Sequence, residues 1–168
     1  MASVSGTTSF SPRAPHVDVG LRRLGLGLTL GAALWVAAVV WLPFHVHHGA
    51  SPIVTTAVYG AGALVCHQRP ERSFHGRDAQ FPVCARCTGL YVGALVGALM
   101  AWSGAAQLPR RVTWILACAA LPTAVTLAVE LSGAAAPSNL SRAVAALPLG
   151  GTAAWVVLRM LREPGSPW

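Results

Sequence analysis

Four residues that bind soft metals or carry out redox chemistry lie close together near the middle of the chain. Cys66 and His67 are adjacent, and Cys84 and Cys87 follow in a Cys-Ala-Arg-Cys sequence, so all four fall within 22 residues. Thiolate and imidazole suit zinc, iron or copper, whereas magnesium and calcium prefer oxygen ligands. A Cys-x-x-Cys pair with one more Cys and a His matches a tetrahedral Cys3His zinc shell. The spacing therefore predicts a metal site, with zinc favoured, formed by Cys66, His67, Cys84 and Cys87.

The same thiols allow two other interpretations. A Cys-x-x-Cys pair can cycle between dithiol and disulfide, with Cys66 as the resolving thiol, and the intervening Arg86 favours the thiolate. A structural disulfide is the third interpretation, favoured if the loop faces an oxidising compartment. Spacing favours metal over redox chemistry without excluding either.

The segment between the two cysteine pairs is dense in charged side chains. In the functional interpretation Glu71 is a general acid or base beside the metal, while Arg86 and Arg142 receive an anionic group such as a lipid phosphate. In the alternative interpretation the segment is a solvated loop in which Glu71 pairs with Arg69 or Arg72.

The remaining cysteine and a group of histidines are weaker candidates. Cys118 lies in an apolar run without polar neighbours, which predicts a small buried packing residue. Histidines at the end of the first apolar run are predicted to lie at the membrane interface without a ligand role: His45, His47 and His48.

The composition around these residues is that of an integral membrane protein. Of 168 residues, 54% are hydrophobic and only 10% are charged, too few for a soluble domain. The net charge of +7 comes from twelve arginines and no lysine. The arginines sit at the ends of apolar runs, as membrane anchors do, so we expect a lipid bilayer and not nucleic acid as the partner.

The layout predicts one transmembrane helical domain over residues 21–162, with a flexible N-terminal tail (1–20) and a C-terminal tail (163–168). The fold class is therefore an all-α integral membrane protein, a small bundle of four or five transmembrane helices with a polar Cys/His loop. The second apolar run is shorter than the roughly 20 residues that a span needs, so it is either a short span or re-entrant. The five runs cover residues 24–44, 52–65, 88–102, 112–131 and 143–158.

Arginine placement bears on the number of spans. Five spans would put eight arginines inside and four outside, whereas four spans would give seven and five. The positive-inside tendency thus favours five spans and a cytoplasmic cysteine loop. With either number, two runs separate the loop from residues 130–142, so this segment is predicted to form the opposite wall of the site.

Polar and small residues in the later runs suggest how that wall and the bundle are built. Glu130 is the only acidic residue of these spans and is either functional or paired with Arg142. Ser138 and Asn139 are predicted to cap the following helix. Glycines repeat every four residues and predict close helix packing in the bundle or in a homo-oligomer: Gly89, Gly93 and Gly97, and Gly27 and Gly31.

Two segments carry a family resemblance. Cys66–Phe74 (CHQRPERSF) and Phe81–Gly93 (FPVCARCTGLYVG) resemble the hallmark of a family of small prokaryotic multi-pass membrane proteins. It is catalogued as number two thousand and eighty-five among the domains of unknown function. The resemblance extends more loosely from about residue 50 to 158. It implies a location in a prokaryotic cytoplasmic membrane and a shared cysteine-centred site, but no established reaction.

The family also tends to have an acidic and an amide residue in the fourth run. Here Thr126 stands where the acid is expected and Glu130 where the amide is expected. A Ser-Thr-Asn-x-x-Arg-like turn follows in the family, which Pro137–Arg142 resembles, whereas the family's Thr-Gly is not obvious. The resemblance therefore implies a shifted or weakened activity in this chain.

Three functions follow from these observations. The first is a metal-binding membrane protein, acting as a hydrolase or transferase on a substrate at the level of the lipid headgroups. Four protein ligands would close the zinc shell, so catalysis would need one of them, such as His67, to give way to water. The second is a membrane thiol-disulfide oxidoreductase or redox sensor, and the third is a structural membrane subunit without catalytic activity.

Overall fold

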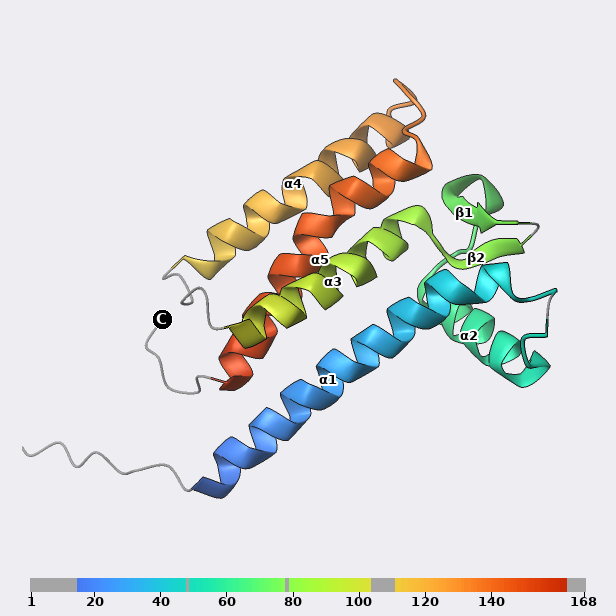
Figure 1. Ribbon diagram of the computed structural model, residues 1–168. Helices are drawn as coiled ribbons and strands as arrows, with labels where there is room; N and C mark the ends of the chain where they lie inside the picture. Colours follow the sequence, from blue (N-terminus) through green and yellow to red (C-terminus); the bar gives the residue numbers. More distant parts are fainter. Residues whose placement is uncertain (1–14, 48, 78, 104–110, 163–168) are drawn as a thin grey trace, which may run out of the picture.

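Four long apolar helices form the body of the protein, as Figure 1 shows. The computed structural model describes residues 15–47, 49–77, 79–103 and 111–162. Within these ranges, the helices long and apolar enough to cross a membrane are α1 (Pro15–Trp41), α3 (Ala85–Ser103), α4 (Val112–Leu131) and α5 (Asn139–Arg162). Large apolar side chains such as Leu34, Trp114 and Leu121 lie exposed on them and would face lipid. The predicted helical membrane bundle is confirmed.

Helices α3 and α5 run parallel and form the closest contact in the bundle. A Cβ atom added to any of the α3 glycines would overlap α5 backbone: Gly89 with Ala143, Gly93 with Leu147 and Gly97 with Gly151. These contacts advance by four residues on both helices, so the two backbones touch along three turns. The predicted packing role of the α3 stripe is confirmed, and the stripe is used within the chain. The α1 stripe meets no atom within 4 Å, and its role in an oligomer stays a prediction: Gly27 and Gly31.

The other helices attach to this pair. Helix α4 lies against α5, where the Thr123 hydroxyl donates a hydrogen bond of 2.8 Å to the Ala145 carbonyl. Helix α1 lies against α3 and α5, and the Trp102 indole N–H donates a 2.9 Å bond to the Thr29 hydroxyl. In lipid, where no water is available, such bonds satisfy polar groups that would otherwise be costly to bury.

A short helix and a β-hairpin cover one end of the bundle (Figure 1). The 3₁₀ turn η1 (Leu42–Phe44) follows α1, and then come α2 (Pro52–Val65), the 3₁₀ turn η2 (Pro70–Arg72), β1 (Ser73–Gly76) and β2 (Ala79–Cys84). The strands are antiparallel, with Ser73 opposite Cys84 and Gly76 opposite Ala79. The segment between the cysteine pairs was predicted as a polar loop, and it contains this hairpin.

A small apolar core fixes the hairpin to the end of α1. Val39 of α1 packs with Phe81 and Val83 of β2, all three at most 8% exposed, and Trp35 and Tyr91 flank them. The ring of Phe81 also meets that of Phe44 in an edge contact, with centroids 6.2 Å apart. On the other side Gly62 of α2 approaches the Pro82 carbonyl so closely that a Cβ atom would overlap it.

This core decides the number of spans. The segment that follows α2 packs against the C-terminal end of α1, so the chain leaves α2 at the same end of the bundle at which it left α1. Helix α2 therefore does not run the length of the bundle, and the described residues contain four candidate spans. The arrangement agrees with four spans and not with the five favoured by arginine counting.

Two element boundaries differ from those predicted. Helix α1 begins at Pro15, so residues 15–20 of the predicted tail are helical, while residues 1–14 and 163–168 lie outside the described residues. Helix α3 begins at Ala85, three residues before the predicted start, and this places Cys87 in its first turn.

The glycine contacts generate a matched stability test. Replacing Gly97→Ala puts a methyl group into the α5 backbone and forces the two helices apart, which we expect to cost about 1–3 kcal/mol of unfolding free energy. Gly27→Ala is the control, because its Cβ would meet no atom within 4 Å. Thermal unfolding in detergent measures both variants, and equal midpoints would contradict the close packing of α3 on α5.

Four spans also predict the orientation of the protein. Seven of the twelve arginines stand before α1 or in its first half, between α3 and α4, or in the last turn of α5. With four spans, α1 and α4 begin and α3 and α5 end at the end of the bundle opposite the hairpin, so we expect that end in the cytoplasm and the hairpin outside, in place of a cytoplasmic cysteine loop. Single cysteines at exposed positions of the two ends, His75→Cys and Ser103→Cys, test this in a background without native cysteines. A membrane-impermeant maleimide should label only the first in intact cells, and the reverse pattern would overturn the orientation.

Candidate functional site

Three of the predicted metal ligands meet where α2, β2 and α3 converge. Cys66 follows the last residue of α2, Cys84 ends β2, and Cys87 lies in the first turn of α3. Their Sγ atoms all lie within 4.8 Å of one another. Zinc bonds to sulfur are about 2.3 Å long, which in a tetrahedron separates the sulfurs by roughly 3.8 Å, so small shifts would seat an ion. The arrangement fits a three-thiolate metal centre.

The fourth predicted ligand, His67, lies beside this cluster without joining it. Its side chain is exposed and lines the same cavity as the three cysteines, but its ring nitrogens lie outside the group of close ligand atoms. Metal binding by His67 stays a prediction.

Two glutamines hold the cysteine segments in place. Gln68 adopts a left-handed backbone conformation (φ 47°), and its side-chain amide donates to the Tyr59 carbonyl at 2.8 Å and to the Pro82 carbonyl at 2.6 Å. The Gln80 amide donates in return to the Gln68 carbonyl at 2.5 Å. These bonds join α2 to β2 directly after Cys66, which positions that thiol beside Cys84. Sequence reasoning did not single out either glutamine.

The environment of Cys84 favours its thiolate. A hydrogen bond from the Cys87 thiol is the largest effect and, with further hydrogen bonds and against the opposing effect of burial, lowers the pKa of Cys84 to about 5. The Cys84 backbone N–H also donates to Cys66 Sγ at 3.2 Å. Thiolates are the form that binds metals and attacks disulfides, so this thiol suits both chemistries.

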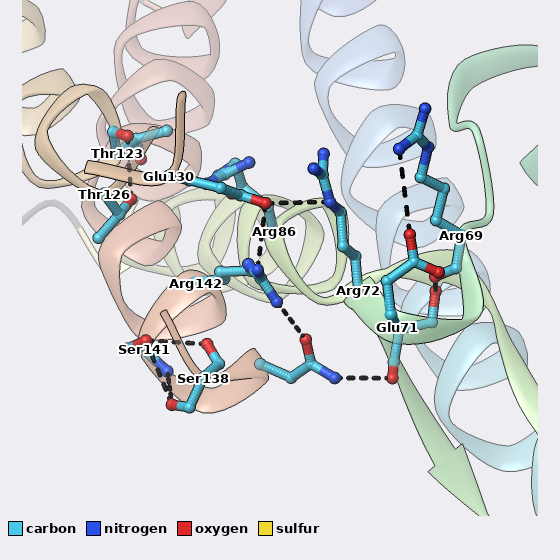
Figure 2. A network of polar contacts seen from close by, with 12 residues as sticks. Arg69, Glu71, Arg72, Arg86, Thr123, Thr126, Glu130, Ser138, Ser141 and Arg142 are labelled. Carbon is cyan, nitrogen blue, oxygen red and sulfur yellow. Dashed lines mark hydrogen bonds and ion pairs between the residues drawn. The ribbon is translucent and has the colours of Figure 1, made fainter. Parts of the chain in front are cut away.

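A buried carboxylate, that of Glu130, pairs with three arginines, as Figure 2 shows. Glu130, near the end of α4, lies 2.9 Å from Arg72 Nε, 3.2 Å from Arg86 Nη2 and 3.1 Å from Arg142 Nη2. The side chains of Glu130 and Arg142 are each only 9% exposed. The arginines come from η2, α3 and α5, so one acid joins four elements. We call these residues the Glu130 cluster: Arg72, Arg86, Glu130 and Arg142.

The start of α5 extends this network to the hairpin. Asn139 donates to the Ser73 carbonyl at 2.9 Å and accepts a 2.8 Å bond from Arg142 Nη1. The Ser138 hydroxyl accepts the Ser141 backbone N–H at 3.1 Å, as expected of a helix cap. The predicted opposite wall thus contacts the hairpin, and the predicted pairing of Glu130 with Arg142 is confirmed.

One cavity adjoins both the thiols and the arginines. It has a volume of about 350 Å³, near the lower end of small-molecule pockets at about 300–1,000 Å³. Two buried guanidinium atoms at this site, Arg86 Nε and Arg142 Nε, make no hydrogen bond among the described residues. The cavity is lined by the three cysteines, by His67 and by four arginines: Arg69, Arg72, Arg86 and Arg142.

The structure separates the predicted catalytic residues. Arg86 and Arg142 line the cavity, whereas Glu71 does not. The Glu71 side chain is 64% exposed and lies 4.0 Å from Arg69, the pairing that the solvated-loop interpretation expected. The carboxylate in contact with the predicted arginines is instead Glu130, and Arg72, which joins it, was not predicted to belong to the site.

The weaker candidates lie away from this cavity. Cys118 is exposed on α4, so the prediction of a buried packing residue is wrong, since this face of α4 is open to lipid. His45 stacks on Trp41 with ring centroids 3.9 Å apart, and its Nδ1 lies 3.0 Å from the Trp41 carbonyl. His47 joins no group of metal ligands among the described residues, and His48 lies outside them.

Comparison with known proteins places this site in a family. Residues 66–156 match the family described as predicted membrane protein (DUF2085). An uncharacterized protein of Methanothermobacter thermautotrophicus is 34% identical over 86 residues, or 51% of this chain and 78% of the relative. An uncharacterized protein of Methanocaldococcus jannaschii is 31% identical over 114 residues, or 66% of this chain and 72% of the relative. No solved structure matches the chain significantly.

Proposed function

The chain belongs to the predicted membrane protein family DUF2085, and we propose that it is a metal-binding membrane protein whose cysteine cluster holds zinc at the membrane surface. The observation that carries the proposal is the approach of three Sγ atoms to within 4.8 Å at the wall of a cavity. Thiolates are soft ligands, which favours zinc over magnesium or calcium. Three protein ligands leave the fourth position of a tetrahedral ion to the cavity.

A hydrolase or transferase that acts at the level of the lipid headgroups fits this arrangement. When bound, zinc would supply Lewis-acid polarisation of a group held in the cavity. Arg86 and Arg142 would orient an anionic group through charge-assisted hydrogen bonds. Glu130 is engaged by three arginines and Glu71 lies outside the cavity lining, so the group placed to exchange a proton there is the exposed ring of His67.

A thiol-disulfide oxidoreductase is the second candidate, favoured by the Cys84-x-x-Cys87 pair at the start of α3 and the low pKa of Cys84. In this reaction Cys84 attacks a disulfide of a partner protein, forms a mixed disulfide and releases one partner thiol. Cys87 or Cys66 then attacks the mixed disulfide and releases the second thiol. The protein's two thiols are oxidised to a disulfide and the partner's disulfide is reduced.

Metal analysis of the purified protein tests the first proposal. We expect about one zinc ion per chain, lost on replacement of Cys66→Ser, Cys84→Ser or Cys87→Ser, because each removes one of three ligands. Cys118→Ser, far from the cluster, is the matched control and should keep the metal. Zinc that is absent from the wild type, or unaffected by the three substitutions, would overturn the proposal. The same assay on His67→Ala tests whether His67 is a fourth ligand. Loss of zinc in this variant would indicate four protein ligands and a structural site.

The second candidate is tested by the pH dependence of thiol alkylation in metal-free protein. A pKa of about 5 keeps Cys84 a thiolate at pH 6, so its reaction with iodoacetamide should change little between pH 6 and 8 and slow only as the pH falls through 5. An ordinary thiol, with a pKa of about 8.5, would slow more than ten-fold over the first interval. Mass mapping after mild oxidation should find a disulfide that includes Cys84. Three cysteines that never pair would exclude the redox function.

A further inference from the structure

We infer that the cavity beside the cysteines binds a phosphate-type dianion through Arg72, Arg86 and Arg142. The inference deepens the proposed function and rests on it for the reaction, because it names the chemical class that the site would act on. Binding of the anion itself needs no metal, so the two ideas can fail separately.

The Glu130 cluster carries an excess of positive charge. The Glu130 cluster places three guanidinium groups around one carboxylate, which leaves two positive charges in a region where the Arg142 and Glu130 side chains are 9% exposed. Glu71, the acid next to Arg72 in the sequence, pairs with Arg69 outside the cluster. Buried charges are normally balanced by partners, and a thiolate among the neighbouring cysteines would offset one of the two, which still leaves positive charge for an anion.

Two arginines of the cluster have a guanidinium N–H that no described residue accepts. Glu130 engages Arg72 Nε, Arg86 Nη2 and Arg142 Nη2, and Asn139 takes Arg142 Nη1. The Nε atoms of Arg86 and Arg142 stay buried without a partner among the described residues. Buried unsatisfied donors are rare and costly, and here they belong to two arginines that line the cavity.

Pairing with Glu130 holds the guanidinium groups of the three arginines in a fixed geometry. Figure 2 shows the three arginines approaching Glu130 from different elements, namely η2, α3 and α5. Their positions are therefore set before any ligand arrives, which reduces the entropy lost on binding. The cavity of about 350 Å³ has room for more than a phosphate group, and Val65 and Leu90 give it an apolar part beside the arginines.

The ligand has two sources with the same chemistry, a lipid phosphate headgroup or a free phosphate. The cavity lies at the end of the bundle where α3 and α5 begin, so it is accessible at the level of headgroups. We therefore test both sources on one protein preparation.

The experiment titrates chelator-treated protein in neutral detergent with inorganic phosphate, and separately with micelles of short-chain phosphatidic acid, by calorimetry. We expect saturable binding of at least one of them, weakened about ten-fold in Arg72→Gln or Arg86→Gln, because each removes one charge-assisted donor. Arg77→Gln is the matched control, since it removes the same charge from the exposed hairpin turn outside the cavity. Arg72 is 38% exposed, so its replacement should leave the fold intact, as thermal unfolding would show.

The outcomes separate the possibilities. Tighter binding of phosphatidic acid than of inorganic phosphate supports the inference with a lipid source, and comparable binding supports it with a soluble source. No binding of either by the wild type, or equal binding by the wild type and the folded cavity variants, overturns it. Because no metal is present in these titrations, protein that binds zinc but no anion would contradict only this inference, and protein that binds the anion but no zinc would contradict only the metal proposal.

Discussion

The carboxylate of Glu130 is the contact on which the site end of the molecule depends. It holds guanidinium groups from η2, α3 and α5 within 3.2 Å, although its own helix packs mainly against α5. Removing one partner of a buried ion pair typically costs about 3–5 kcal/mol, because the remaining charge stays buried. Here one carboxylate neutralises part of three such charges at once, so the ends of four elements are fixed relative to one another.

This cluster can form because the glycines let α3 and α5 approach. Contacts between Gly89 and Ala143 and between Gly93 and Leu147 set the two helices parallel and in register, so both begin at the same end of the bundle. Arg86 and Arg142 therefore lie in the first turns of neighbouring helices, within reach of one acid. With larger side chains at the glycine positions the helices would separate and both arginines would need partners elsewhere.

The sequence could predict the elements that hydropathy and topology determine. The four long spans follow from apolar runs, and α4 has the predicted bounds, because lipid requires about 20 apolar residues in a helix. The opposite wall was predictable since two spans return the chain to the same side. The hairpin could not be predicted, because the only sequence pattern that indicates a strand there is the short alternation of the apolar residues Phe81 and Val83 within a polar segment. Arg72 was missed because an adjacent Glu71 offered a local partner, whereas its actual partner is 58 residues away in the chain.

The family resemblance placed the expected acid at Thr126, one helical turn before Glu130. Residues four apart share a helix face, so an acid at either position projects from the same side of α4. In this chain Thr126 bonds to the Thr123 carbonyl at 3.0 Å, and Glu130 meets the arginines. The acidic group is thus present in the site, shifted toward the end of α4, and this argues against a site that has lost its charge pattern.

The two halves of the site also depend on each other electrostatically. A zinc ion with three thiolates carries one net negative charge, so an anion approaching its open position would be repelled in a medium of low dielectric constant. The Glu130 cluster lies on the same cavity and has two positive charges in excess of its carboxylate, which would offset that repulsion. The arginines would therefore allow a negative group to enter the cavity beside the thiolates, and this is why we treat the proposed metal and anion sites as parts of one functional centre.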